Sequence, residues 1–271
     1  MAARNALRLR SFLLSSMAAT ADILQVKELS KSFGKLQAVD GISFNLAAKK
    51  ITILIGPNGS GKTTLVNLIS GFYKPDGGDV FYRSKRITGW APHRVYRAGI
   101  ARTFQIPALF SKLNVLENVL VAEKQNPGEG FLRAPLERLW RAPEEASTES
   151  AARILELLGL SKIWEKRANA LSGGQMKLLE IGRALMSGAD LLLLDEPISG
   201  VNPTLAHEIF NTIVRLSQEL GVTFLVIEHR LDIALGYVDN VIAMAYGKLI
   251  ASGSPDSVIS DPRVIEAYIG A

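Results

Sequence analysis

The sequence contains no cysteine and only three histidines among its 271 residues. Without cysteine, a disulfide framework, thiol catalysis and a cysteine-ligated metal are all excluded. The three histidines, His93, His207 and His229, are too few for a histidine-rich metal site. No apolar run approaches the roughly 20 residues that span a bilayer, so we expect any role at a membrane to depend on a partner. The net charge of +5 is mild and does not by itself indicate a nucleic-acid binder.

The composition is that of a globular protein, with 48% hydrophobic and 21% charged residues. A chain of 271 residues can form one sizeable domain, or one domain with a subdomain. The first residues are rich in arginine and serine and contain no acidic residue before Asp22, as in a transit peptide. We favour a non-folding leader over residues 1–22, since Met17 could equally begin the protein. The folded domain is therefore expected over residues 23–271.

A glycine-rich segment organises the chain. It follows Ile51–Ile55, a short β-branched run that predicts a buried strand, and leads into Thr64–Ile69, which has helical apolar spacing. The pattern G-x-x-x-x-G-K-[ST] of a phosphate-binding loop is met from Gly56 to Thr63. The predicted nucleotide-binding residues are Gly56, Pro57, Asn58, Gly59, Ser60, Gly61, Lys62, Thr63 and Thr64.

The chemistry of this loop requires these residue types. Glycines let backbone N–H groups close around phosphate oxygens, and the helix N-terminus adds positive potential. Lys62 should reach the β and γ phosphates, and the Thr63 hydroxyl should bind Mg²⁺. The sequence thus predicts binding of a nucleoside triphosphate.

Strand-rich sequence surrounds the loop. Alternating segments at Ile23–Leu29 and Ile42–Leu46, and a third at Asp79–Tyr82, predict strands. Lys31–Gly34 is predicted to form a turn. Phe33 lies at this turn, where it could stack on the adenine or simply pack in the core, and its position alone does not decide between the two.

The middle of the chain has a different character. Ile100–Gln105 predicts a short strand ending on a glutamine, and the following Pro107 marks a joint. Residues 107–170 are expected to form an inserted helical subdomain, with amphipathic helices at Val115–Val121 and Ala151–Leu158. Between these helices, glycines and prolines predict a loop with short helical pieces over residues 126–148.

Leu171–Gln175 has the sequence Leu-Ser-Gly-Gly-Gln and precedes a helical segment. Ser172 is a good N-cap, and Gly173 and Gly174 leave backbone N–H groups bare at the start of the helix. These features predict a second anion-binding helix terminus.

Two further strands end on polar residues. Leu191–Leu194 is a continuous apolar run that predicts a central parallel strand, and Asp195 and Glu196 follow it. In a chain with a phosphate loop, two carboxylates at the carboxyl end of a strand suit a Mg²⁺ partner and a water-activating base. The buried strand Val222–Ile227 leads similarly to His229. Residues 255–271 predict a helical tail interrupted at Asp261-Pro262.

The order of these motifs resembles that of ABC transporter ATPases, from about Ile23 to the end of the chain. The Leu-Ser-Gly-Gly-Gln block is close to diagnostic, and the Asn-Lys-x-Asp block of guanine-binding proteins is missing. The resemblance implies an α/β fold: a P-loop NTPase core of the ABC ATPase type with an antiparallel β subdomain and an inserted α-helical subdomain. It also implies ATP hydrolysis coupled to transport.

Finer features resemble the ATPases of branched-chain amino acid importers. They are Gly99–Gln105 followed by Val115–Asn118, the segment Ile227–Asp232, and the tail Asp261–Gly270. Urea, amide and lipopolysaccharide systems use similar ATPases and remain alternatives for the cargo. A soluble ABC ATPase outside transport is the alternative from another class.

The resemblance implies a role for each motif. Lys62 and the loop amides would hold the phosphates of ATP, with Phe33 against the adenine. Thr63 and Gln105 would ligate Mg²⁺, and Asp195 would hold that ion through water.

The remaining roles concern hydrolysis. Glu196 would be the general base for the attacking water, and His229 would contact the γ-phosphate and orient that water, with Gln105 reporting the phosphate to a partner. Ser172, Gly173 and Gly174, within the block that Gln175 closes, would bind the γ-phosphate of a nucleotide held by another subunit.

The implied partners are a second ABC ATPase subunit, identical or a paralogue, in a head-to-tail dimer, and transmembrane permease subunits. A permease loop is expected near Ala108–Leu116, at the cytoplasmic face of the membrane, with a solute-binding protein acting indirectly. Asn202 stands where many ABC ATPases have aspartate. Its amide could still hydrogen-bond across the dimer interface, but it carries no charge. No nucleic-acid partner is expected, because Arg94, Arg97 and Arg102 suit a solvated surface better.

Overall fold

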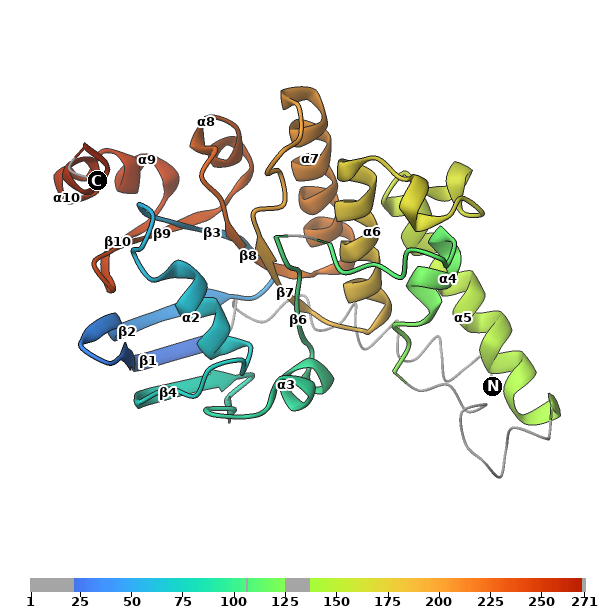
Figure 1. Ribbon diagram of the computed structural model, residues 1–271, viewed down its shortest axis with the longest axis horizontal. Helices are drawn as coiled ribbons and strands as arrows, with labels where there is room; N and C mark the ends of the chain where they lie inside the picture. Colours follow the sequence, from blue (N-terminus) through green and yellow to red (C-terminus); the bar gives the residue numbers. More distant parts are fainter. Residues whose placement is uncertain (1–21, 106, 125–136, 270–271) are drawn as a thin grey trace.

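The computed structural model describes residues 22–105, 107–124 and 137–269 (Figure 1). The predicted leader lies outside the described residues apart from Asp22, which begins the first strand.

A six-stranded sheet forms the centre of the molecule, in the order β10-β9-β3-β8-β7-β6. Its strands are β3 (Ile51–Ile55), β6 (Ile100–Arg102), β7 (Leu191–Asp195), β8 (Thr223–Ile227), β9 (Asn240–Ala245) and β10 (Lys248–Gly253). Neighbouring strands are parallel except for β9 and β10. Every residue of β3, β7 and β8 is buried, which explains their continuous apolar sequences. The predictions of buried strands at Ile51–Ile55 and Val222–Ile227 and of a central parallel strand at Leu191–Leu194 are confirmed.

A second, antiparallel sheet has the order β2-β1-β4-β5. It contains β1 (Asp22–Phe33), β2 (Leu36–Ala47), β4 (Gly77–Tyr82) and β5 (Lys85–Arg86). The turn predicted at Lys31–Gly34 is wrong in its first three residues, because Lys31, Ser32 and Phe33 continue the ladder with β2. Helix α2 (Lys62–Ile69) lies between the two sheets and contributes buried apolar side chains to one core with both of them (Figure 1).

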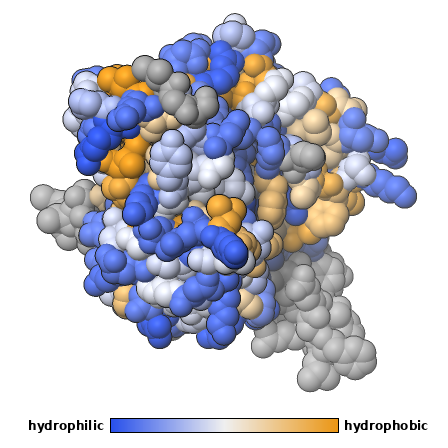
Figure 2. Space-filling view, turned by 60° about the vertical axis from the view of Figure 1, so that its left-hand side comes forward, coloured by the Kyte–Doolittle hydropathy of each residue, from blue (hydrophilic) through white to orange (hydrophobic). Residues whose placement is uncertain are grey.

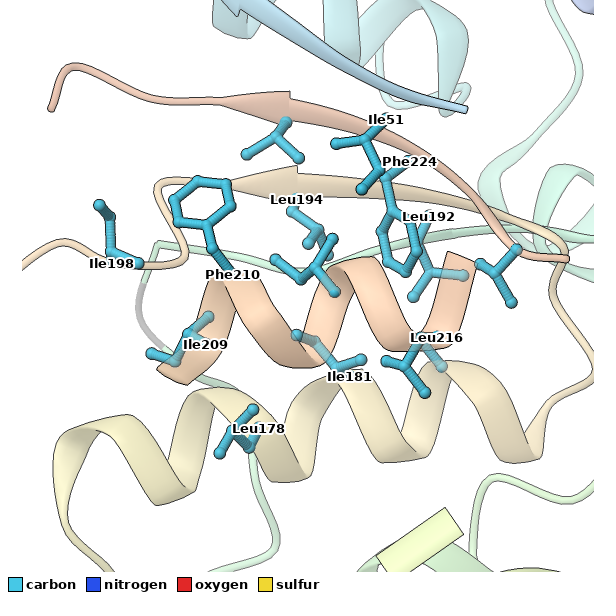
Figure 3. Close-up of a cluster of buried hydrophobic side chains, with 14 of the residues drawn as sticks. Ile51, Leu178, Ile181, Leu192, Leu194, Ile198, Ile209, Phe210, Leu216 and Phe224 are labelled. Atoms are coloured by element: carbon cyan, nitrogen blue, oxygen red, sulfur yellow. The ribbon is translucent and has the colours of Figure 1, made fainter. Parts of the chain in front are cut away.

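The opposite face of the central sheet is covered by α6 (Gly173–Met186) and α7 (Pro203–Leu220). Figure 3 shows the core between them: Phe210 and Leu216 of α7 pack toward Leu192 and Phe224 of the sheet, and Ile181 of α6 packs on α7. Burial of such side chains contributes about 1.5–3 kcal/mol each. This layer fixes α6 relative to the ends of β7 and β8.

The helical subdomain lies beyond α6 (Figure 1) and contains α4 (Val115–Leu120), α5 (Glu137–Leu157) and short 3₁₀ turns at Ser161–Ile163 and Ala168–Ala170. The loop predicted over residues 126–148 is wrong from residue 137 onward, where α5 is continuous and contains Pro143. A proline there removes one backbone hydrogen bond. The buried side chains of Ala151 and Leu155 further along α5 stabilise the helix despite this loss.

The remaining helices lie at the edges of the core. They are α3 (Pro92–Ala98), α8 (Leu231–Ala234) with a 3₁₀ turn at Leu235–Tyr237, α9 (Pro255–Ile259) and α10 (Pro262–Ile269). The predicted break at Asp261-Pro262 is confirmed between α9 and α10. The face shown in Figure 2 is mostly polar, with separate apolar patches. Within the described residues, no helix is both long and apolar enough to cross a membrane.

Candidate functional site

The phosphate-binding loop joins β3 to α2, as predicted. The Lys62 side chain folds back over this loop: its Nζ donates to the carbonyl oxygens of Gly56 at 2.8 Å and Pro57 at 2.9 Å, with the Ser60 hydroxyl at 3.4 Å. Burial lowers the pKa of Lys62, while the carboxylates of Glu196 and Asp195 oppose that shift. A partly desolvated ammonium held by its own loop is poised to exchange these carbonyls for phosphate oxygens.

The first glycine of the loop is required by packing. At Gly56 a Cβ would lie 2.1 Å from the carbonyl oxygen of Met244, and φ is +149°. Gly61 precedes the helix with φ +101°, where a Cβ would lie 2.2 Å from the carbonyl oxygen of Ala38. Side chains at either position would push the loop away from β2 or β9, so these glycines also set the position of the loop.

A cavity of about 510 Å³ opens beside the loop. Asn58–Thr64 line one side, and Phe33 lines it from the end of β1. The Phe33 ring is 44% exposed and contacts Tyr73 edge-on, at 5.3 Å between ring centroids. An exposed aromatic ring in the same cavity as a phosphate loop suits stacking on a base. Leu36 and Tyr246 also line this cavity and are largely exposed, and neither was predicted from the sequence.

Three predicted catalytic side chains meet at the edge of this cavity. Glu196 Oε2 accepts a hydrogen bond of 3.0 Å from Gln105 Nε2, and Glu196 Oε1 lies 3.4 Å from His229 Nε2. Each residue follows a strand of the central sheet: Gln105 follows β6, Glu196 follows β7 and His229 follows β8. Because these strands are parallel neighbours, their carboxyl ends meet at one edge, where ligands bind in such sheets.

The strand predicted to reach Gln105 ends at Arg102 instead. The Thr103 amide still donates to the Leu193 carbonyl of β7 at 3.0 Å, and then the Phe104 amide turns to the Glu180 carboxylate at 3.2 Å. The glutamine therefore lies on a loop that leaves the sheet.

Asp195 has an internal partner that sequence reasoning missed. Its Oδ2 lies 3.0 Å from the guanidinium of Arg102, which also donates to Asn67 of α2. The prediction that Arg102 is a surface residue is wrong, since its side chain is 7% exposed, whereas Arg94 and Arg97 are exposed. Arg102 lies beside Leu193 in the β6–β7 pairing, and this register directs it inward. The position of Arg102 within the predicted strand Ile100–Gln105 was the available sign that its side chain is buried.

The Leu-Ser-Gly-Gly-Gln block starts α6, as predicted. Ser172 caps the helix: its amide donates to Gln175 Oε1 at 3.0 Å, and its hydroxyl accepts from the Gln175 amide at 3.4 Å. Ser172 and Gly173 are exposed, whereas Gly174 packs on Leu205, so that a Cβ there would lie 2.3 Å from a methyl carbon of that residue.

The block is not part of the phosphate-loop cavity, since no residue of 172–175 lines it. One chain therefore does not bring the two predicted phosphate sites together. Asn202, for which the sequence predicts a role across a dimer interface, caps α7 by accepting from the Leu205 amide at 2.9 Å.

A second hollow, of about 380 Å³, lies at the joint between the core and the helical subdomain. Phe104 and Phe110 line it and are 40% and 48% exposed. The guanidinium of Arg102 lies 5.3 Å from the Phe104 ring centroid, and that of Arg183 lies 5.0 Å from the Phe110 ring centroid. This groove includes Ala108, within the segment predicted to receive a partner loop.

Glu180 of α6 lies at the base of this groove and is 8% exposed. Burial raises the pKa of Glu180 to about 7, although hydrogen bonds from the Phe104 and Ala108 amides and the charges of Arg183 and Lys177 act in the opposite direction. Glu180 was not predicted, although a charged residue within the apolar run of a helix was a signal for it.

The raised pKa predicts a pH-dependent stability. Because the folded state binds the Glu180 proton more tightly than the unfolded state, this contribution to stability is full below about pH 4.5, where both states are protonated, and is lost as the pH rises from there through about 7. We expect the wild type to lose about 2.5 kcal/mol more than Glu180→Gln between pH 5 and pH 8, since one pKa unit is about 1.4 kcal/mol and a part of the total is already lost at pH 5. Urea unfolding of both proteins at the two pH values measures this difference. Equal pH dependence would contradict the shift.

The C-terminal helix contacts the phosphate loop. The Gly56 amide donates to the Tyr268 hydroxyl at 2.8 Å, across 212 positions in sequence. We expect Tyr268→Phe to weaken ATP binding by about threefold to tenfold, because one hydrogen bond that orders the loop is worth about 0.5–1.5 kcal/mol. Titration with ATP measures the change. Tyr246→Phe is the matched control, because Tyr246 and Tyr268 line one hollow beside Asn58–Ser60. A Tyr268→Phe affinity equal to that of the control would contradict the prediction.

Known proteins similar to this chain share one description. The ABC transporter family profile matches residues 39–199, and the profile of branched-chain amino acid ATP-binding cassette transporters matches residues 248–271. A probable branched-chain amino acid transport ATP-binding protein LivG of Methanocaldococcus jannaschii is 48% identical over 255 residues, which cover 93% of this chain and 98% of that protein. The high-affinity LivG protein of Escherichia coli is 36% identical over 249 residues, which cover 92% and 98%.

Solved structures agree with these relatives. An ATP-binding cassette of an ABC transporter in its ADP conformation matches with a TM-score of 0.81 and 46% identity, covering 93% of this chain and all of that one. A nucleotide-free cassette matches with a TM-score of 0.79, also at 46% identity. The predicted α/β fold of the ABC ATPase type is therefore confirmed.

Proposed function

The chain belongs to the ABC transporter family of ATPases, and on that premise we propose that it is the ATP-hydrolysing subunit of an importer of branched-chain amino acids. The single observation that carries the mechanism is the meeting of Gln105, Glu196 and His229 beside the phosphate loop. The cargo is proposed from the names of the relatives and from the match at residues 248–271.

In the proposed reaction, ATP lies in the cavity with its adenine against Phe33 and its phosphates in the loop. Lys62 exchanges the loop carbonyls for phosphate oxygens. Glu196 accepts a proton from the attacking water as its oxygen bonds to the γ-phosphorus, and the bond to the leaving ADP breaks. His229, beside Glu196, hydrogen-bonds the γ-phosphate and orients the water.

The residues present fit Mg²⁺. The Thr63 hydroxyl is exposed at the start of α2, and the amide oxygen of Gln105 remains free to bind a cation while its nitrogen bonds Glu196. Both offer the hard oxygen ligands that this ion prefers, and Asp195 would hold it through water. When bound, Mg²⁺ neutralises charge on the β and γ phosphates.

The site of one chain is proposed to be completed by a second ATPase subunit. Ser172 and Gly173 present exposed backbone at a helix N-terminus and do not line the cavity of their own chain. In a head-to-tail dimer they would bind the γ-phosphate held by the partner, close the site to water and stabilise the developing charge. Hydrolysis would then follow dimer closure.

The groove at the joint between the core and the helical subdomain is proposed to receive a permease loop. Its exposed rings, Phe104 and Phe110, offer apolar contact, and Arg183, against the Phe110 ring, adds positive charge. A loop with apolar and acidic side chains would fit this surface. Gln105 lies between the groove and Glu196, so it connects the γ-phosphate to the partner. The subunit would thus lie at the cytoplasmic face of the membrane through its permease.

Reconstitution tests the proposal. The full chain should co-purify with a transmembrane permease, and with that permease and its solute-binding protein it should drive ATP-dependent uptake of leucine, isoleucine or valine into proteoliposomes. Uptake of urea, an amide or a lipopolysaccharide instead would replace the cargo but keep the transport role. Association with only soluble partners would overturn the importer and favour an ABC ATPase outside transport.

A further inference from the structure

Helix α6 buries two charged side chains where an apolar stripe is expected. Lys177 and Glu180 are 9% and 8% exposed, and they lie three positions apart, on one face of the helix. Charged residues are rarely buried to this degree unless they are paired, because removing them from water costs several kcal/mol. Their partners therefore indicate why they are there.

Lys177 holds the backbone of Glu196. Its Nζ donates to the Glu196 carbonyl oxygen at 2.6 Å, and the same oxygen accepts from the Ser199 amide at 3.1 Å. Glu196 has φ +50°, a left-handed conformation that is unfavourable for a residue with a side chain. Two hydrogen bonds to one carbonyl offset this cost and fix the direction in which the Glu196 carboxylate leaves the backbone.

A buried carboxylate holds the same loop from another strand. Glu228, at the end of β8, accepts from the Ile198 amide at 2.9 Å and from the His229 amide at 3.0 Å. It thereby ties the loop after Glu196 to the backbone of His229. The hydrogen bond from Lys177 connects the loop after Glu196 to helix α6.

Glu180 holds the loop that carries Gln105. Its carboxylate accepts from the Phe104 amide at 3.2 Å and from the Ala108 amide, one on each side of Gln105. Arg183, three residues further along α6, donates to the Ala108 carbonyl. Lys177 thus binds the backbone of Glu196, and Glu180 binds the backbone beside Gln105. The side chains of Glu196 and Gln105 meet at 3.0 Å.

We infer that Lys177 and Glu180 are positioning residues for hydrolysis: through them α6 fixes Glu196 and Gln105 relative to each other and to Ser172 at its own N-terminus. This inference rests on the proposed function, in which Glu196 is the base. A rigid helix that begins at the partner-facing block and holds both loops moves the base and the glutamine together with that block.

Lys177→Met tests the inference, because methionine keeps the length of the stem but removes the donor. In the full chain we expect kcat to fall about tenfold to 100-fold, with the Kd for ATP within about threefold of the wild type. Lys177→Arg restores a donor to the Glu196 carbonyl. Its kcat should lie above that of Lys177→Met by at least a third of the difference in log kcat between Lys177→Met and the wild type. Lys162→Met, at an exposed lysine, is the matched control.

The double variant separates this inference from the proposed function. If Lys177 acts through Glu196, adding Lys177→Met to Glu196→Gln should lower single-turnover hydrolysis by less than about twofold. A further tenfold loss in that background, or an unchanged kcat in Lys177→Met alone, would overturn the inference. If Glu196→Gln itself hydrolyses ATP normally, the proposed base is wrong and the failure lies there. Glu180→Leu, which removes the acceptor for the Phe104 amide, should also lower kcat by less in the Glu196→Gln background than alone. Losses of kcat that add in full would contradict the positioning role of Glu180.

Discussion

Replacing Glu196 with glutamine should leave ATP binding intact and lower turnover about 10²–10⁴-fold, the usual contribution of a general base. The amide has nearly the same shape as the carboxylate but cannot accept a proton from water. It can still bond Gln105, and the backbone bonds from Lys177 and Ser199 involve the unchanged carbonyl. Steady-state hydrolysis together with equilibrium ATP binding measures the two parts of this expectation.

A matched control distinguishes the chemistry from a general loss of charge. Glu208→Gln removes an exposed carboxylate from α7 and should hydrolyse ATP at the wild-type rate. Retained ATP binding would show that the fold and the phosphate loop are preserved in Glu196→Gln. Hydrolysis close to the wild-type rate in that variant would exclude Glu196 as the base.

The parts of the site that the sequence predicts are those set by local structure or by strand order. Gly56–Thr63 is recognisable because the strand, the loop and the helix are contiguous, and each of its glycines has a positive φ. The convergence of Gln105, Glu196 and His229 needs only the fact that parallel strands present their carboxyl ends at one edge. Both constraints are present before any long-range packing is known.

The missed residues depend on contacts between distant segments. Arg102 is buried because β6 pairs with β7 in a register that directs its side chain toward Asp195 and Asn67. Tyr268 reaches Gly56 only because α10 returns to the start of the loop. Neither the strand register nor the position of a terminal helix can be derived from a local pattern, so the sequence did not reveal these partners.

In α5, contacts with distant segments also outweigh the local sequence preference for a broken helix. Pro143 and the nearby glycines predict a broken segment, but the apolar residues of this helix pack into the core cluster that α4 and α6 share. The free energy of that burial exceeds the cost of one lost hydrogen bond. The helical subdomain is thus held on the same helix that carries Ser172, Lys177 and Glu180. Movement of that subdomain would be transmitted directly to the backbones of the site.

Lys62→Ala should weaken ATP binding by about 10²–10³-fold and abolish hydrolysis at ordinary ATP concentrations. Charge-assisted hydrogen bonds to phosphate are worth about 1.5–3 kcal/mol each, and the lysine is positioned to make more than one. Part of this loss is offset, because the unliganded loop also loses the bonds from Lys62 to the Gly56 and Pro57 carbonyls. The net effect is therefore smaller than the sum of the phosphate bonds. Calorimetric titration with ATP measures it.

The position of Lys62 makes this variant informative about binding rather than folding. Its hydrogen bonds stay within the loop, so its removal should shift the thermal midpoint by only a few degrees. Lys162→Ala, at an exposed lysine of the helical subdomain, should bind ATP like the wild type. An affinity of Lys62→Ala within threefold of that control would mean that the loop amides and the α2 N-terminus suffice for the phosphates. In that case the ammonium would serve mainly to hold the empty loop closed.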